Sequence, residues 1–341
     1  MFTNTTKNTM RSYRILIIGA ALLALVSSSC KKDKEEEMLP YLTGTPEIDL
    51  PLYGKAGDTF SFTGHGVKDD DGKAPDGYYW YVTPILQNRD TSDTFKFTVP
   101  DTLCTITVTC GAFKDGYYST SNSKSLTIVN DDRTNGSLKG NLFDVMKDFV
   151  YTDSRDGHEY WCTTIGGTDW FKDNLAYGDA GYPLENCSAT KGLFGLFYTW
   201  EDAMVSCPEG WRVSSLKDWA DAAKAMTGKD YDTATTMNGV AVDFMGDVRF
   251  NGEKMWEYWP DVNITNKSGL CLMPTGYAIS SGKDKAKFES MNGYSVYWTS
   301  DTDDNDHAFY RYIYEEQPDM MIGSTEKNSF AATVRCVRDH E

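Results

Sequence analysis

The sequence predicts a chain with two folded parts, an all-β sandwich followed by an α+β domain. Three observations support this prediction. Short stretches with apolar residues at every second position fill residues 39–129, which is typical of strands with one buried face. An Asp156-Gly157 turn then joins two further strand-like stretches, and two segments with apolar residues at helical spacing follow it. The 341 residues suffice for two domains and a tail.

Composition limits the possible functions. Hydrophobic residues make up 40%, aromatic residues 13% and charged residues 24% of the chain, which excludes global disorder. Fifty Asp and Glu against 33 Lys and Arg give a net charge of -17, so we expect no nucleic-acid partner. Walker, Gly-x-Ser-x-Gly and His-x-x-x-His patterns are absent from the sequence, and we expect no cofactor and no catalytic residues.

The N-terminus predicts export. Lys7, Arg11 and Arg14 precede an apolar run over residues 15–26. This run of about 12 residues is much shorter than the ~20 residues that span a bilayer. We therefore expect a signal peptide over residues 1–29, with the start at Met1 or Met10 left open.

The residues after the apolar run predict lipidation. Three serines and Cys30 resemble the bacterial lipobox, although Leu is usual where Ser27 stands. The alternative is an ordinary signal peptide with an incidental cysteine. Residues 30–38 are mainly charged and predict a solvated tether, and Lys34 followed by acids resembles a surface-export signal. We expect a lipid anchor at Cys30 in the outer membrane and a protein that faces the cell exterior.

The first folded part is predicted over residues 39–130. The clearest strand patterns are residues 59–63, 95–99, 105–109 and 125–129. Trp80 is the expected core tryptophan, and the pattern resembles immunoglobulin-like or PKD-like sandwiches. Residues 131–137 are polar and rich in turn formers, and predict a linker.

The second part is predicted over residues 138–341. A hairpin is expected from residues 149–152 and 159–165 around the Asp156-Gly157 turn. Residues 196–204 have helical spacing and predict a helix that ends at Cys207-Pro208. A second helix is expected from about residue 216 to 226, capped by Ser214 or Ser215.

Nine ordered blocks of this second part resemble one known family, the Fibrobacter succinogenes major paralogous (FISUMP) domain. The blocks are residues 165–166, 170, 174–175, 196–200, 203–204, 207–214, 273–277, 297–300 and 334–339. The resemblance covers about residues 150–339. It implies a C-type-lectin-like α+β fold in bacterial surface lipoproteins, and it implies no known reaction.

The cysteines agree with an exported protein, in which disulfides persist. The resemblance implies a bridge between Cys207 and Cys336, which would join the first helix to the last strand. Cys104 and Cys110 are a second candidate pair within the sandwich. The sequence leaves open the pairing of Cys162, Cys187 and Cys271.

An aromatic segment is the predicted ligand site. Trp256, Tyr258, Trp259 and Asp261 lie in a stretch without periodicity, which predicts a loop. Tryptophan and tyrosine rings stack on the apolar faces of sugars, and a neighbouring acid accepts hydrogen bonds from hydroxyls. The alternative is that the two tryptophans fill the domain core.

Gln317-Pro318-Asp319 resembles the sugar-binding loop of galactose-type C-type lectins, which makes Gln317 and Asp319 weak calcium candidates. Such lectins also have a Trp-Asn-Asp strand before the final cysteine, and this chain has none there. We favour a hairpin turn between paired strands at residues 310–314 and 331–334, and expect no metal.

These observations lead to three hypotheses for the function. The first is a surface-exposed outer-membrane lipoprotein that binds a glycan or glycoprotein without catalysis. The second is a structural or adhesin subunit of a cell-surface protein assembly. The third is an enzyme of unknown reaction, for which the sequence offers no set of catalytic residues.

Overall fold

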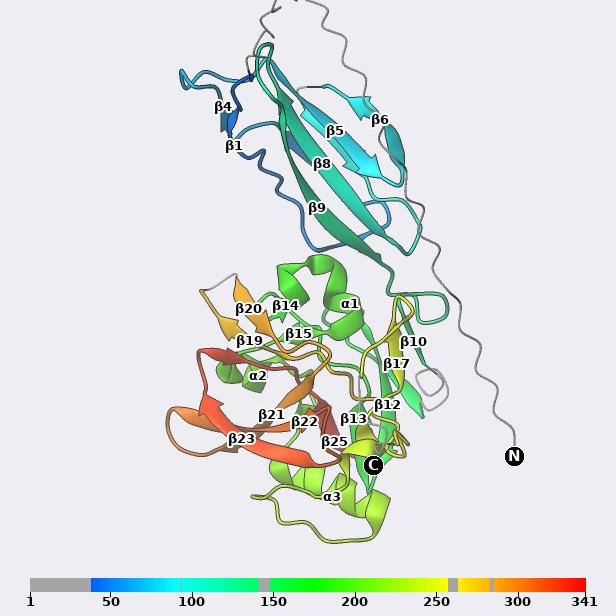
Figure 1. Cartoon of the computed structure of the whole chain (residues 1–341). Coiled ribbons are helices and arrows are strands. Elements are labelled where there is room, and N and C mark those ends of the chain that lie inside the picture. The colour runs from blue at the N-terminus through cyan, green and yellow to red at the C-terminus, as the bar shows by residue number, and fades with distance from the viewer. Residues whose placement is uncertain (1–37, 93, 141–147, 257–262, 283–284) are drawn as a thin grey trace, which may run out of the picture. The chain divides into compact units, whose positions relative to one another are not determined.

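The computed structural model describes residues 38–92, 94–140, 148–256, 263–282 and 285–341, and these form mainly β-sheets (Figure 1). By contacts, the chain divides into Met1–Leu39 and Pro40–Glu341. The expected signal peptide, Cys30 and almost all of the tether lie outside the described residues. In the ranges given above, no helix is long and apolar enough to cross a membrane.

The strands up to residue 129 form two main sheets, and all four stretches predicted as strands lie in them. The larger sheet has the order β2 (Tyr53–Lys55), β9 (Thr120–Val129), β8 (Thr105–Phe113), β5 (Gly77–Thr83) and β6 (Leu86–Asp90). The second main sheet pairs β3 (Thr59–Thr63) with β7 (Thr94–Thr98). A separate short sheet pairs β1 (Thr43–Gly44) with β4 (Val67–Lys68).

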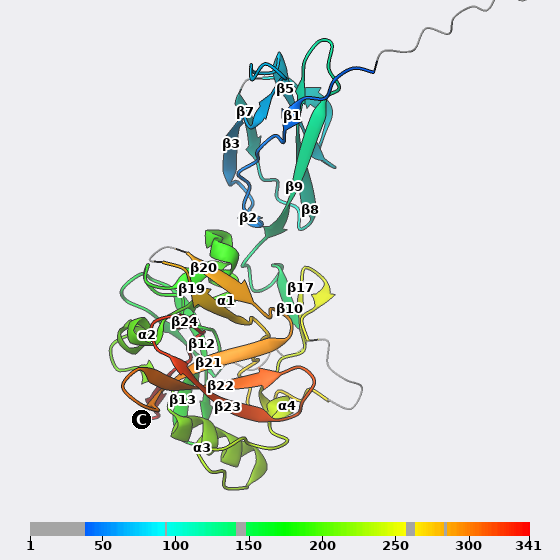
Figure 2. The ribbon, with the colours of Figure 1, turned by 60° about the vertical axis from the view of Figure 1, so that its left-hand side comes forward.

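Aromatic side chains hold the two main sheets together. Trp80 on β5 is fully buried, which confirms the prediction that it is a core residue. Its ring stacks on Phe62 of β3 (centroids 5.6 Å apart) and on Phe95 of β7 (5.5 Å apart). Figure 2 shows β3 and β7 as a layer apart from β8 and β9. Burial of these rings between the layers provides the hydrophobic driving force for this part of the fold.

The largest sheet of the C-terminal part contains the last strand of the chain in its interior. Its order is β11 (Phe149–Thr152), β12 (Glu159–Ile165), β13 (Thr168–Phe171), β25 (Cys336–Asp339) and β16 (Arg212–Val213). The predicted hairpin is confirmed, with Thr152 opposite Glu159. All neighbouring strands of this sheet are antiparallel.

Smaller sheets complete the C-terminal part. They are β10 (Leu138–Gly140), β17 (Val248–Phe250) and β18 (Glu253–Lys254); β14 (Tyr182–Pro183) and β15 (Leu196–Phe197); β20 (Ala286–Glu289), β19 (Tyr277–Ser280) and β24 (Phe330–Ala331); and β21 (Tyr294–Thr302), β22 (His307–Tyr314) and β23 (Met320–Glu326). The described helices are α1 (Lys191–Phe194), α2 (Trp200–Ser206), α3 (Leu216–Thr227) and α4 (Ala241–Phe244), with short 3-10 turns at Leu184–Asn186 and Ser188–Thr190.

The second predicted helix is confirmed as α3, and Ser215 is its cap. Ser215 and Asp218 form a reciprocal capping box. The first predicted helix begins later than expected, at Trp200. Leu196 and Phe197 are both buried and pair as a strand with β14, and the Thr199 side chain accepts a hydrogen bond from the Asp202 backbone to start α2.

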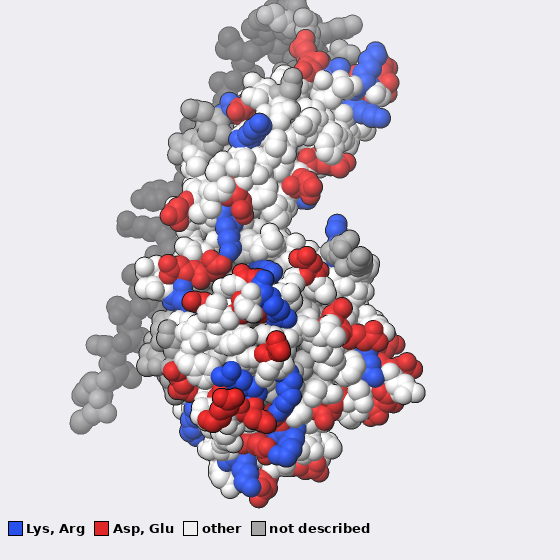
Figure 3. All heavy atoms as spheres, turned by 180° about the vertical axis from the view of Figure 1, so that it is seen from behind, with Lys and Arg blue, Asp and Glu red and all other residues white. Residues whose placement is uncertain are grey.

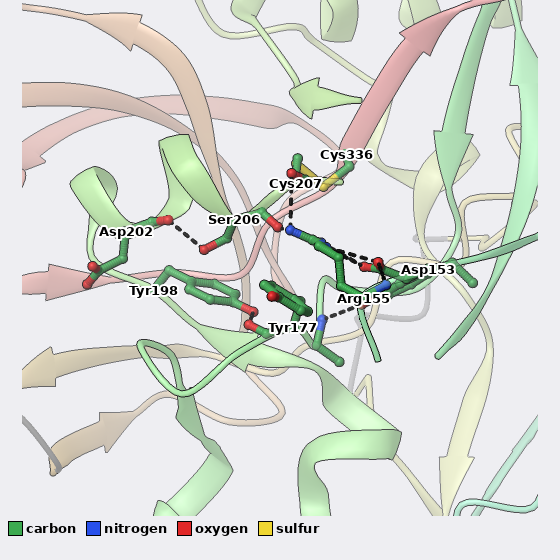
Figure 4. The surroundings of a disulfide bond; sticks show 10 residues. Asp153, Arg155, Tyr177, Tyr198, Asp202, Ser206, Cys207 and Cys336 are labelled. Carbon is green, nitrogen blue, oxygen red and sulfur yellow. Dashed lines mark hydrogen bonds and ion pairs between the residues drawn. A yellow bond between two sulfur atoms is a disulfide. The ribbon is translucent and has the colours of Figure 1, made fainter. Parts of the chain in front are cut away.

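The expected Cys207–Cys336 disulfide is confirmed (Figure 4). It joins the residue after α2 to the first residue of β25. Arg155 lies beside it and donates hydrogen bonds to the backbone oxygens of Ser206 (3.0 Å) and Cys207 (3.5 Å). A cation in this position satisfies carbonyl groups at the C-terminus of the helix and interacts favourably with its dipole.

Asp153 orients this arginine. Its carboxylate is fully buried and accepts a hydrogen bond from Nη2 of Arg155 at 2.7 Å. Burial raises the pKa of Asp153, but the hydrogen bonds and the charge of Arg155 outweigh burial and hold the pKa below its ordinary value. The loop of the first hairpin is therefore tied to the end of α2.

The expected pair of Cys104 and Cys110 is wrong, because both are free thiols. Cys110 lies within β8 and Cys104 directly precedes that strand. At ~3.3 Å per residue an extended chain separates their Cα atoms by about 20 Å, so no bridge can form. Cys162 and Cys187, whose pairing the sequence also left open, are free and buried, and Cys271 is buried.

Charged side chains of both signs are interspersed over the face drawn in Figure 3. On this face, Lys and Arg lie among Asp and Glu and form no continuous basic stripe.

We predict that removal of the disulfide destabilises the protein. The bridge closes a loop with a sequence separation of 129, which in the chain-entropy model is worth about 4–5 kcal/mol. The double variant Cys207→Ala/Cys336→Ala should therefore unfold at a clearly lower urea concentration. The control is Cys104→Ala, which removes a free thiol, and an equal midpoint for both variants would contradict the prediction.

We also predict that the buried thiols are unreactive in the folded protein. Burial raises the pKa of Cys110 and of Cys162, each to about 12, so both remain protonated at neutral pH. Peptide mapping after iodoacetamide treatment should find the half-buried Cys104 modified, and Cys110 and Cys162 modified only after unfolding. Equal modification of all three before unfolding would be the contrary result.

Candidate functional site

Three tyrosines share one face of β22. Along this strand, Arg311 and Ile313 are fully buried on one side, and Tyr310, Tyr312 and Tyr314 alternate with them and are half-buried on the other. Successive side chains of a strand point to opposite faces, so the Tyr-x-Tyr-x-Tyr spacing brings the three rings together. The result is an aromatic surface on a rigid strand.

The neighbouring strand β21 extends this surface. Tyr294 stands opposite Tyr314, and Trp298 stands opposite Tyr310. The ring centroids of Tyr294 and Tyr314 are 4.8 Å apart, and those of Trp298 and Tyr310 are 6.1 Å apart. These cross-strand pairs lie within the usual range of favourable aromatic contacts.

Aromatic residues of β19 and β24 pack beside the surface formed by β21 and β22. Tyr277 of β19 stacks on Phe330 of β24 at 5.1 Å, and Phe330 in turn stacks on Tyr310 at 5.4 Å. Gly276 donates a backbone hydrogen bond to the Tyr294 carbonyl, which places β19 beside β21. Between these elements lies a cavity of about 300 Å³, which we call the tyrosine hollow. Its lining residues are Tyr277, Ser290, Tyr294, Val296, Tyr310, Tyr312 and Phe330.

A glycine makes room for one of the rings. Gly323 of β23 stands opposite Tyr310. A Cβ atom at this position would lie 2.3 Å from Cζ of Tyr310, so any larger residue would displace the ring. The Tyr310 ring therefore lies over Gly323, the position at which β23 has no side chain.

The tyrosines of this surface are neutral hydrogen-bonding groups. Burial raises the pKa of Tyr294 and of Tyr310. A hydrogen bond to Glu316, followed by burial, raises the pKa of Tyr314 to about 12. These phenols keep their protons at neutral pH, so each combines an apolar face with a hydroxyl that can donate.

Carboxylates lie close to tyrosines of this surface in strand register or in sequence. Glu289 of β20 stands opposite Tyr277 in the strand register, and Lys287 of the same strand pairs with it at 2.5 Å. At the other end, Glu315 and Glu316 directly follow Tyr314 at the end of β22. An aromatic cavity with a polar border is an arrangement that binds small molecules, and its chemistry is recognition of a ligand that is partly apolar and partly hydroxylated.

The predicted aromatic site does not lie here. Trp256 is 1% exposed, and its indole N–H donates to the Leu272 carbonyl at 3.1 Å, so its ring belongs to the core and not to a surface site. The expectation of a ligand contact at Trp256 is therefore wrong. Tyr258, Trp259 and Asp261 lie outside the described residues.

The two calcium candidates lie in the turn between β22 and β23. Gln317 donates a backbone hydrogen bond to the Tyr314 carbonyl, and the Asp319 carboxylate accepts one from the Gly239 backbone at 2.7 Å. The partner of β22 across this turn is β23, not residues 331–334 as predicted. Within the described ranges, no group of three or more His, Cys, Asp and Glu is placed to hold a metal ion.

The sequence contained a signal for the tyrosine hollow that the aromatic-loop prediction did not use. Tyrosines at positions 310, 312 and 314 have the spacing that puts side chains on one face of a strand. The contributions of Tyr277, Tyr294 and Phe330 depend on contacts between segments far apart in the sequence. Only the three-dimensional structure brings these segments together.

Comparison with models of known protein families finds one match. The model of the family described as Fibrobacter succinogenes major domain matches residues 163–338, from β12 to β25, and this range includes the tyrosine hollow. A comparison with curated proteins finds no match. A solved structure of a calcium-binding mutant of beta-glucuronidase 2 from Bacteroides uniformis is similar at 10% identity with a TM-score of 0.20. The similarity covers 85% of this chain but only 29% of that one, and a TM-score this low carries no argument.

We predict that Gly323→Ala disturbs the Tyr310 ring. The added methyl group should lower the unfolding free energy by about 1–3 kcal/mol, the usual cost of overpacking. In a Tyr310→Ala background the same substitution should cost little, because the clashing ring is gone. Urea unfolding of the wild type, both single variants and the double variant measures this coupling, and an equal cost in both backgrounds would rule out the clash.

Proposed function

Given that the chain belongs to the Fibrobacter succinogenes major domain family, we propose that it is a non-catalytic binding protein whose ligand is a glycan or glycoprotein. The observation that carries this proposal is the tyrosine hollow. Its rings come from four strands of the described fold, and its volume of about 300 Å³ suits a small group such as one or two sugar units.

The chemistry of the hollow supports a sugar as the bound unit. The apolar C–H face of a pyranose stacks on an aromatic ring, and its hydroxyls exchange hydrogen bonds with phenols and carboxylates. Tyrosine provides both interactions with little loss of side-chain freedom. We do not assign catalytic residues, and binding alone is proposed.

The finer identity of the two folded parts belongs to the same proposal. A C-type-lectin-like fold for residues 138–341 is supported by α2 and α3, by the interior last strand and by the bridge from the first of these helices to that strand. An immunoglobulin-like sandwich for residues 39–130 is supported by the two facing sheets around Trp80.

The cellular location is proposed from the N-terminal sequence. A signal peptide over residues 1–29, a lipidated Cys30 and a charged tether would place the protein on the outer membrane, facing outwards. There the tyrosine hollow would meet glycans of the surroundings or of a partner protein.

One observation favours the second hypothesis, a structural or adhesin subunit of a surface assembly. This hypothesis expects the aromatic segment around residue 256 to be buried, and Trp256 is buried. In that case the partner would be another surface protein.

We predict that oligosaccharide binding depends on the tyrosine hollow. Titration calorimetry of residues 40–341 against an oligosaccharide panel should find a saturable ligand. Tyr294→Ala or Tyr312→Ala should weaken its binding at least about fivefold, because a stacked ring is typically worth more than 1 kcal/mol. The control is Tyr118→Ala, which removes a 40% exposed tyrosine of the N-terminal part.

Each outcome decides between hypotheses. Binding that survives both Tyr294→Ala and Tyr312→Ala would reject the hollow as the site. Loss of binding on addition of a chelator alone would support the calcium candidates Gln317 and Asp319. Failure to bind any oligosaccharide would reject the glycan proposal and favour a protein partner.

A further inference from the structure

The innermost residues of the tyrosine hollow carry an inference about its ligand. If the hollow is the glycan site, as proposed above, we infer that it receives a sugar unit that bears a methyl group, and that this methyl group occupies the inner end of the hollow. Acetamido sugars and deoxy sugars both offer such a group. The residues that line the cavity select it by their size, their burial and their hydrogen-bonding capacity.

A short side chain on β21 leaves space among the rings. Val296 lies between Tyr294 and Trp298 on one face of this strand, because these positions alternate with Ser295 and Tyr297. Across the sheet, Val296 stands opposite Tyr312 of β22. Its neighbours on this face are thus all larger aromatic residues, and Val296 itself lines the hollow that lies among them.

Two apolar side chains form the inner end of the hollow. Val296 is 2% exposed and Phe330 is 8% exposed, and both line the cavity. Neither side chain can donate or accept a hydrogen bond. A ligand hydroxyl placed against them would lose its hydrogen bonds to water without a partner from either side chain. A methyl group in the same place would gain from leaving water.

Polar groups lie nearer the opening. Tyr277, Tyr294, Tyr310 and Tyr312 are half-buried and Ser290 is exposed, so these lining residues are more accessible than Val296 and Phe330. Each of them provides a hydroxyl that can donate and accept hydrogen bonds. The hollow therefore combines an apolar inner end with a polar outer part.

A sugar unit with a methyl group matches both parts. Its ring hydroxyls can exchange hydrogen bonds with the phenols, its C–H face can stack on a ring, and its methyl group can contact Val296 and Phe330. A sugar with a hydroxyl in place of that methyl group fits the same space but leaves this hydroxyl unpaired. Discrimination of this kind typically amounts to about tenfold or more.

Two matched pairs of ligands test the inference and separate the two sources of a methyl group. L-fucose and L-galactose differ in whether one carbon is a methyl or a hydroxymethyl group. Trimers of N-acetylglucosamine and of glucose in the same linkage differ in whether an acetamido group or a hydroxyl is present. In calorimetric titrations of residues 40–341, we expect the methyl-bearing member of at least one pair to bind at least about fivefold more tightly.

Variants of one valine locate the selection. Val296→Thr replaces a methyl group by a hydroxyl at nearly constant shape, and should lower the preference at least about threefold, because the hydroxyl-bearing sugar then finds a partner. Val296→Ala keeps the inner end apolar and should retain the preference. The matched control is Val248→Thr, which changes a 1% exposed valine that does not line the hollow, and should leave the preference unchanged.

The outcomes separate this inference from the proposed function. Sugar binding that is lost in Tyr294→Ala but shows no preference within either pair would overturn the selection of a methyl group and support the glycan site. A preference that is equal in the wild type and in Val296→Thr would overturn the inner end of the hollow as its cause. Failure to bind any oligosaccharide would overturn both proposals.

Discussion

The pairing of the last strand with two earlier strands is the constraint on which the C-terminal part depends. β25 lies between β13 and β16, and the disulfide at Cys336 holds it there. The residues just before β25 contact other sheets. Phe330 lines the tyrosine hollow, Ala331 pairs with Ala278, and Thr333 forms a β-bridge with Tyr297. Residues 330–339 therefore connect the main sheet to the strands that carry the aromatic surface, and displacement of this segment would affect both.

Local signals made much of the fold predictable. The Asp156-Gly157 turn fixes a hairpin within neighbouring residues, and Ser215 with Asp218 marks the start of α3, so both elements follow from short stretches of chain. The start of α2 was not predictable in this way. Apolar spacing at Leu196 and Phe197 fits a helix, but pairing with β14 makes these residues a strand, and pairing is a long-range interaction.

The candidate site was harder to predict for the same reason. Aromatic residues that are close together in the sequence need not lie together on the surface, and Trp256 lies in the core. The tyrosine hollow instead combines rings from separate segments between residues 277 and 330. Their spacing predicts a strand face, but which faces meet depends on the sheet order β21-β22-β23 and on the contact with β19, which the sequence pattern does not contain.

The order of elements along the chain also determines when each part can form. β1 to β9 are drawn from one continuous stretch, residues 43–129, so these sheets have all their strands early during synthesis. The main C-terminal sheet instead needs β25, whose residues up to Asp339 are made after every other strand of that sheet. Contacts over such separations form slowly, because loop closure precedes the gain from packing. A nascent chain would therefore carry a finished N-terminal part and an open C-terminal part until β25 has been made.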